Sequence, residues 1–503
     1  MAYFSGTLIG YLSISPLVLI GCVITLSLIW ASKNRKLAST APGPFPWPLI
    51  GNLVSLGKKP HRYLTELRAT YGDVFQITMG TTPTIVLNGL KTIRSAMIKQ
   101  AEDFAGRPDF YSFKFIANGK SMGFGDYGPR WKMHRRIAQN SLALFTNKRN
   151  SPIEMAIVSE ADVLTSNFLG SEGAPFDPHN EIYLSVGNII CALCFGKRYQ
   201  RDDEDFTHLV KMNDEFMAFA AAGNPVDIMP WMRHFTKSSF NKFIGILETM
   251  NKFSLKKRQE HLDTYDASHM RDITDALIKA TDDIPDEDKE AVGLTDEHIL
   301  TTVQELIGAG FDTIASSLQW SVLFMATHPD VQEAAHAEIR EKVGVNRQLS
   351  FDDIDILPYT EACMLEILRH SCIFPFALPH STTRDTILDG HFIRANTLVF
   401  VNLWSVNHDP EVFNNPSQFD PTRFLDCDGN IDKNTADLFL PFGAGRRKCP
   451  GELLARMELF LFFSSMIQKC LFEIIPGKEP VIDSKYGLTL KPLDFKVAVS
   501  ARR

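Results

Sequence analysis

Several widespread catalytic motifs are missing from this 503-residue chain, and each absence excludes a kind of chemistry. There is no G-x-x-x-x-G-K-[ST] loop, which would cradle nucleotide phosphates, and no H-E-x-x-H helix, which would hold zinc. No Asn-x-Ser/Thr sequon occurs with x other than Pro, which favours a body that stays outside the secretory lumen. The net charge of −7 gives no overall attraction for nucleic acid, so any basic contact surface must be local.

The composition is that of a large folded protein, with 45% hydrophobic and 22% charged residues, 27 Pro and 31 Gly. These proportions exclude a disordered, collagen-like or small disulfide-stapled chain. The eight cysteines are scattered along the sequence, which favours reduced thiols over a disulfide framework. Because no repeat, low-complexity tract or Gly/Ser linker interrupts the body, we expect one large domain.

The N-terminal segment has no Asp, Glu, Lys or Arg before residue 33. Residues 7–30 are mostly apolar, and about 20 such residues suffice to cross a bilayer as a helix. Basic residues follow at once, which places the rest of the chain in the cytoplasm. We therefore predict a transmembrane anchor at 1–32, a basic and Pro-rich extended linker at 33–48, and a globular domain at 49–503. A buried core helix is the alternative for the first segment.

Hydrophobic periodicity beyond residue 90 is mostly helical, and the strand signals are few. Strands are predicted as a pair within 78–87, as a hairpin at 387–393 with Asp-Gly at its turn, and at 398–401. The acidic, Pro-containing stretch 282–290 predicts a surface loop. One unusually long apolar helix is predicted at 294–327, ended by a proline. The fold class is therefore mainly α with a small β region.

Two motifs resemble known sites without the context that those sites need. The sequence from Gly123 to Gly128 fits G-x-G-x-x-G, but no strand precedes it and no βαβ unit surrounds it, so a loop is predicted. Cys191 and Cys194 lie three residues apart on an apolar helical run with no second cysteine pair nearby. We therefore interpret them as core residues and not as metal ligands.

One cysteine lies in a setting unlike the others, within the segment 441–451 (PFGAGRRKCPG). The glycines there let the backbone approach another group closely. The basic residues before Cys449 and a helix N-terminus after it are expected to lower the pKa of the thiol and to favour thiolate. Pro450 suits the first turn of that helix. A thiolate offered by such a loop is suited to ligating a metal cofactor.

The same loop matches the haem-binding signature of the cytochrome P450 superfamily, F-x-x-G-x-R-x-C-x-G. Three further motifs occur in the order of that family: A-G-F-D-T at 309–313, E-x-x-R at 366–369 and P-T-R-F at 421–424. The chain therefore resembles a microsomal P450 over essentially its whole length. Shorter stretches are similar to the family-1 aryl hydrocarbon hydroxylases, namely 223–231, 271–278, 308–313, 379–386 and 486–490.

The resemblance implies a single cytochrome P450 fold that binds haem b. The Cys449 thiolate would be the iron ligand, and Phe442 would lie in the same cofactor loop. The haem propionates would be held by Arg107, Trp131, Arg135, His380 and Arg447. In the long helix, Gly308 and Gly310 would leave room for a flat ring and for dioxygen.

Catalytic and structural roles follow from the same resemblance. Thr313 would donate a hydrogen bond at the reaction centre, and Asp312 would help to relay protons. Glu366 and Arg369 lie three residues apart on a helix and can pair, and Arg423 can add a second guanidinium. This cluster is expected to brace the cysteine loop and to take no part in the chemistry.

The implied activity is mixed-function oxygenation, in which one oxygen atom enters a substrate and the other leaves as water. The chain has no nicotinamide or flavin motif, so electrons from NADPH must come through a partner. NADPH–cytochrome P450 reductase is the implied donor, with cytochrome b5 as a second one, at the cytoplasmic face of the endoplasmic reticulum membrane. Basic residues near the cysteine would suit an acidic partner, namely Arg130, Lys132, Arg136, Arg446 and Lys448.

The substrates implied by the family-1 resemblance are planar polycyclic aromatics, oestrogens and unsaturated fatty acids. The positions aligned with that pocket are Phe124, Phe216, Phe253, Ala309, Phe311, Leu378 and Leu488. Departures at Met122, Gly123, Gly125 and Phe374 leave the selectivity open. A steroid hydroxylase of the 17α type is one alternative, and a membrane-anchored haem-binding sensor without turnover is another.

Overall fold

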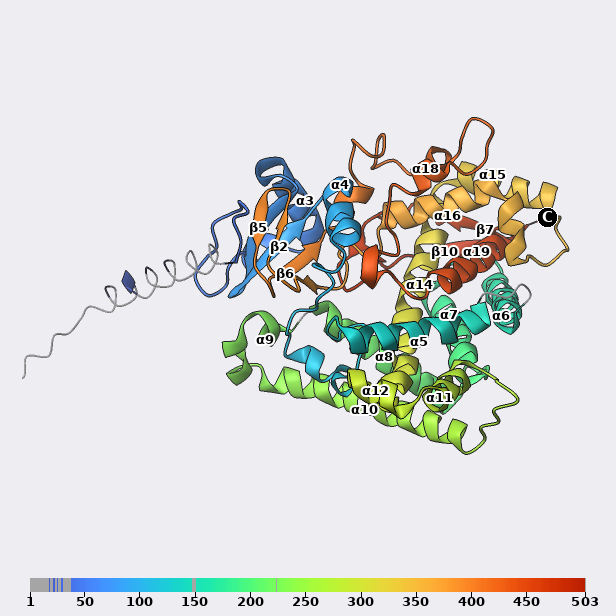
Figure 1. Ribbon diagram of the computed structural model, residues 1–503. Helices are drawn as coiled ribbons and strands as arrows, with labels where there is room; N and C mark the ends of the chain where they lie inside the picture. The colour runs from blue at the N-terminus through green and yellow to red at the C-terminus, as the bar shows by residue number, and fades with distance from the viewer. Residues whose placement is uncertain are drawn as a thin grey trace, which may run out of the picture.

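The computed structural model describes residues 18, 21, 22, 25 and 29 and the ranges 38–146, 151–222 and 224–502. Most of the predicted anchor at 1–32 lies outside the described residues. Among the residues that are described, none of the helices is both long enough and apolar enough to cross a membrane. The main body has a small sheet region at one side and a larger helical region at the other (Figure 1).

Helices occur along the whole described chain, and several of them begin at a proline or at a residue whose side chain caps the helix. In the N-terminal half they are α2 (Leu53–Leu56), α3 (Pro60–Tyr71), α4 (Leu90–Arg94), α5 (Pro129–Thr146), α6 (Pro152–Leu169), α7 (His179–Phe195), α8 (Glu204–Ala222), α9 (Pro225–Ile228) and α10 (Lys237–Leu262). In the C-terminal half they are α11 (Ile273–Asp283), α12 (Asp286–Val292), α13 (Asp296–Leu300), α14 (Thr302–Thr327), α15 (Pro329–Lys342), α16 (Pro358–Ser371), α17 (Trp404–Asn407), α18 (Lys433–Ala436) and α19 (Glu452–Lys469). Proline opens several of them, because its missing N–H has no helical partner at that position.

The largest sheet among the described residues has the strand order β1 (Val74–Met79), β2 (Thr82–Leu87), β6 (Leu398–Val401) and β3 (His380–Ser381). Only the β2–β6 pair in it is parallel. Antiparallel pairs are also formed by β4 (Thr386–Leu388) with β5 (His391–Ile393), β7 (Cys470–Ile474) with β10 (Val497–Ala501), and β8 (Ser484–Lys485) with β9 (Lys491–Pro492). The predicted hairpin with its Asp-Gly turn and the predicted strand at 398–401 are confirmed, and the expected strand pair begins earlier, at residue 74.

The long apolar helix forms the centre of the helical region, but in two pieces. Thr295 caps α13 through a capping box with His298. The helical hydrogen-bonding pattern is interrupted at Thr301, and α14 then continues to Thr327. Helix α14 contacts α7, α16 and α19 and passes through the middle of the helical region (Figure 1). Its side chains are buried over most of its length because neighbours cover nearly every face.

One expectation about local structure needs correction. The acidic stretch 282–290 is not a loop, because α12 occupies residues 286–292. Three acidic residues fill its first turn, where they complement the positive end of the helix dipole. Lys289 lies within 2.8 Å of carboxylate oxygens of both Asp286 and Asp296, which neutralises part of that charge. The acidic residues that were expected to form a surface loop therefore stabilise a short helix.

The Pro-rich segment lies along the sheet region and forms backbone hydrogen bonds with it. The Thr40 amide donates to the Phe392 carbonyl at 3.0 Å, and the Gln76 amide donates to the Pro42 carbonyl at 2.7 Å. Ala41 between them is buried and packs in the hydrophobic cluster around the sheet. The extended backbone that proline favours thus supplies carbonyl and amide groups to neighbouring strands.

Candidate active site

The cysteine loop is shaped by glycines with left-handed backbone. Gly443 and Gly445 have φ of 72° and 70°. A Cβ at Gly445 would lie 1.7 Å from the Met97 carbonyl oxygen, so only glycine fits this approach. The Cys449 amide donates to the Phe442 carbonyl at 2.9 Å, which closes the loop between them. Helix α19 begins at Glu452, so Pro450 lies just before the helix and not in its first turn.

The Cys449 thiol does not have the lowered pKa that the sequence predicts. Burial raises its pKa, which outweighs the hydrogen bond from the Gly451 backbone and the charges of Arg135 and Lys448. The side chain nevertheless keeps exposed surface. The thiol is therefore enclosed by protein on most sides and open on one side. This arrangement suits a side chain that ligates a bound group.

One face of α14 is likewise uncovered. Ala309 is exposed and Thr313, one turn later, is half-buried, although the helix around them is largely buried. The Thr313 hydroxyl donates to the Ala309 carbonyl at 2.8 Å. A Cβ at Gly308 would meet no atom within 4 Å, whereas one at Gly310 would lie 2.3 Å from Ile190. Gly310 therefore permits close packing with α7, while the Ala309–Thr313 face is left open.

Phe311 and Asp312, which lie between Ala309 and Thr313, are both buried and do not face the open surface of α14. Asp312 is buried, with Oδ2 accepting from the Thr489 hydroxyl at 2.5 Å and Oδ1 at 2.5 Å from the Lys491 ammonium. Phe311 is fully buried, and its ring centroid lies 5.5 Å from that of Tyr183 on α7. The proton-relay role of Asp312 and the pocket role of Phe311 stay predictions.

Three arginines predicted to hold propionates form a cluster of positive charge. Arg107 donates to the carbonyls of Gly123 at 2.8 Å and Pro379 at 2.9 Å, and Arg135 donates to the Lys448 carbonyl. Burial, together with the neighbouring arginines, lowers the pKa of Arg107, and burial and Arg135 lower that of Arg447 to about 9. Within the described chain, none of the three forms a salt bridge with a carboxylate. Their mutual repulsion would be relieved by negative groups such as two propionates.

The other predicted propionate partners lie beside this cluster. Trp131 donates its indole N–H to the Met122 carbonyl at 2.9 Å, and the Arg447 guanidinium lies 4.3 Å from the Trp131 ring centroid. His380 is buried with Nδ1 2.7 Å from the Phe104 carbonyl, and burial lowers its pKa well below the ordinary value. Both side chains are thus fixed by backbone contacts.

Glu305 is a site residue whose role the sequence did not reveal. Its carboxylate on α14 accepts from the Ser121 hydroxyl and from the amides of Met122 at 3.0 Å and Gly123 at 2.8 Å. Arg447 binds the carbonyl of Gly125 in the same segment at 2.7 Å. The G-x-G-x-x-G segment, confirmed as a loop, is therefore held between α14 and the cysteine loop. An acid within an otherwise apolar helix is the sequence signal that would have identified it.

The candidate pocket residues make separate side-chain contacts, and their role in a common pocket stays a prediction. Phe124 pairs with Phe113, with centroids 4.6 Å apart. Phe216 stacks with Phe243 at 6.4 Å. The last aromatic candidate, Phe253, is buried in the main core, and the remaining aliphatic ones, Leu378 and Leu488, are half-buried.

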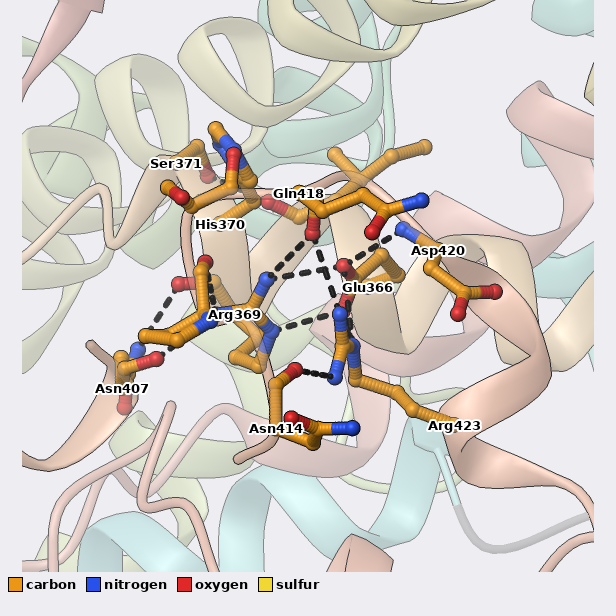
Figure 2. A network of polar contacts seen from close by, with 12 residues as sticks. Glu366, Arg369, His370, Ser371, Asn407, Asn414, Gln418, Asp420 and Arg423 are labelled. Carbon is orange, nitrogen blue, oxygen red and sulfur yellow. Dashed lines mark hydrogen bonds and ion pairs between the residues drawn. The ribbon is translucent and has the colours of Figure 1, made fainter. Parts of the chain in front are cut away.

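The predicted carboxylate–guanidinium cluster is brought together in the core (Figure 2). Glu366 accepts from Arg369 at 2.6 and 2.8 Å and from Arg423 at 3.1 Å. The Asp420 amide adds a fourth bond at 2.9 Å. Arg369 also donates to backbone carbonyls of the segment that leads to the cysteine loop, namely those of Asn407, Pro416 and Gln418. The cluster thus ties α16 to that segment.

These features together fit a haem. An uncovered thiol, an uncovered helix face and a group of unpaired guanidiniums are what an iron ligand, a flat ring and two propionates need. The family model for Cytochrome P450 matches residues 41–499. The chain therefore belongs to the cytochrome P450 family and is a haem-thiolate monooxygenase.

Curated relatives narrow the comparison further. A Platichthys flesus protein named Cytochrome P450 1A1 is 42% identical over 460 residues, which cover 90% of this chain and 88% of that protein. The Rattus norvegicus protein of that name is 42% identical over 478 residues, with 93% and 91% covered. The one from Oryzias latipes is 39% identical over 517 residues, with 100% and 99% covered. The expected similarity to the family-1 enzymes is confirmed.

Proposed function

We propose that this protein oxidises lipophilic substrates, namely planar aromatic xenobiotics, steroids such as oestrogens, and fatty acids, with electrons from NADPH supplied through a reductase. The observation that carries the proposal is the pairing of an uncovered Cys449 thiol with the uncovered Ala309–Thr313 face, in a chain similar to proteins named Cytochrome P450 1A1. Phe124 and Phe216, the aromatic candidates that are half-buried, would favour flat substrates through stacking.

The site residues would have different roles in this reaction. Haem, when bound, supplies the iron chemistry that activates dioxygen, and a thiolate ligand favours cleavage of the O–O bond. Cys449 would be that ligand, and Arg107, Arg135 and Arg447 would neutralise the propionates. Thr313 would turn its hydroxyl away from the Ala309 carbonyl, which it now contacts at 2.8 Å, to donate a hydrogen bond at the reaction centre. Proton transfer involving Asp312 would require its contacts with Thr489 and Lys491 to open.

The proposed electron donor is NADPH–cytochrome P450 reductase, with cytochrome b5 as a second donor. The basic residues that the sequence singled out near the cysteine are all exposed: Arg130, Lys132, Arg136, Arg446 and Lys448. They would steer an acidic partner, and that steering would weaken as salt rises. We further propose that residues 1–32 anchor the chain in the endoplasmic reticulum membrane and that 33–48 link the anchor to the catalytic domain.

Reconstitution tests this function directly. The purified haem-loaded chain is combined with the reductase and NADPH, and oxidised products of a planar polycyclic aromatic and of progesterone are quantified. We expect the aromatic product to dominate and Cys449→Ser to abolish it. Preferred oxidation of progesterone would support the steroid alternative. If haem is bound but no product forms even when NADPH is present, the sensor alternative would be supported.

A further inference from the structure

A groove lies between α10, α11 and the α13–α14 junction, apart from the uncovered Ala309–Thr313 face. The groove is partly open to solvent. Gln304 lines it from α14. Gln304 and Ala309 are five residues apart, so at about 100° per residue they lie roughly 140° apart around the helix. The groove and the candidate active site therefore use different sides of α14.

Polar side chains converge on this groove without partners. Gln304 is 8% exposed, yet its amide makes no hydrogen bond within the described chain. The Ser254 hydroxyl and the Arg258 guanidinium, both on α10, also have no hydrogen-bond or ion-pair partner among the described residues. The Gln304 amide faces the open space of the groove, so it can bind a polar group there without first breaking a hydrogen bond within the protein.

The charge balance of the groove is positive. Glu297 lines it, but its carboxylate pairs with Lys120, so that charge is already neutralised. Arg258 has no such partner. Residues 251, 254, 255 and 258 lie on one face of α10, because they are spaced by three and four positions. An anionic group is therefore attracted to the Arg258 end of this face.

The rest of the lining is apolar or structurally fixed. Leu255, Leu300 and Val303 line the groove beside the polar groups. Asn251 donates to the Asn118 side chain at 3.0 Å and so joins α10 to η3 (Ile116–Gly119). Asn118 itself has left-handed backbone with φ 53°. An occupant must therefore combine one anionic head with a short apolar tail.

We propose that this groove is a second ligand site, which binds an organic carboxylate carrying a short apolar or aromatic tail. The carboxylate would accept from Arg258, Ser254 and Gln304, and the tail would lie against Leu255 and Val303. Charge-assisted bonds to a guanidinium supply most of the selectivity for an acid over a neutral analogue.

The probe for this site is 4-phenylbutyrate, titrated calorimetrically into the haem-loaded full chain. Saturating 1-phenylimidazole occupies the iron side during the titration, so binding at the candidate active site is blocked. We expect saturable binding with one site per chain. The neutral 4-phenylbutyramide and the Arg258→Gln variant should each bind about tenfold more weakly.

The control is Lys252→Gln, which removes an exposed charge from the same helix without touching the groove. It should bind the acid like the parent, and Gln304→Leu should weaken binding while circular dichroism stays unchanged. No saturable binding would overturn the proposal. The proposal would also be overturned if Lys252→Gln and Arg258→Gln weakened 4-phenylbutyrate binding equally, or if 1-phenylimidazole competed with that binding. Neither outcome depends on turnover.

Discussion

The buried cluster around Glu366 allows a quantitative prediction for Glu366→Ala. The substitution removes the acceptor of four hydrogen bonds and leaves Arg369, whose side chain is fully buried, without its carboxylate. Removing one member of a buried ion pair costs about 3–5 kcal/mol. Arg369 keeps backbone carbonyls as acceptors, which places the expected loss of unfolding free energy at about 3 kcal/mol, the lower end of that range.

The comparison variants separate this effect from general damage to α16. Glu361→Ala lies on the same helix but removes a half-buried acid with no hydrogen-bond partner in the described chain, so we expect a loss below about 1 kcal/mol. Adding Arg369→Ala to Glu366→Ala should recover part of the loss, because the unpaired buried charge is then gone.

Urea unfolding followed by far-UV circular dichroism measures these differences, with haem absorbance recorded in parallel. If Glu366→Ala lost no more stability than Glu361→Ala, the cluster would not be the brace described above. A double variant that is less stable than the sum of the two single changes would contradict the argument from an unpaired charge.

Three further predictions concern the iron ligand, the open helix face and a buried acid. Cys449→Ser should remove the red-shifted Soret band of the reduced carbon monoxide complex, and persistence of that band would refute the ligand assignment. Thr313→Ala should raise NADPH consumption relative to product formed, whereas unchanged coupling would count against its hydrogen-bonding role. Glu458 is fully buried on α19 and burial raises its pKa to about 8 from 4.5, so the folded state holds its proton more tightly than the unfolded state. Stability should therefore fall as pH rises from 4.5 to 8, and Glu458→Gln should remove up to about 5 kcal/mol of that dependence in urea titrations at several pH values. A parent and variant with parallel pH profiles would contradict this reasoning.

Much of the local structure followed from short-range patterns. The hairpin around Asp389-Gly390 formed as expected, because its turn chemistry is local. The acidic stretch 282–290 was mispredicted as a loop, because a sequence window does not reveal that Lys289 lies within 2.8 Å of both Asp286 and Asp296. The break at Thr301 was missed for a similar reason, since apolar periodicity continues across it.

Residue types and their spacing were enough to predict the chemistry, because the cysteine loop and its companion motifs are recognisable without coordinates. Tertiary structure alone decided which side chains are free to act. It turned Asp312 toward Lys491, placed Phe311 in the core and recruited Glu305 to hold a loop more than 180 residues away. Burial also decided the pKa of Cys449, because desolvation depends on every neighbour and not only on adjacent charges.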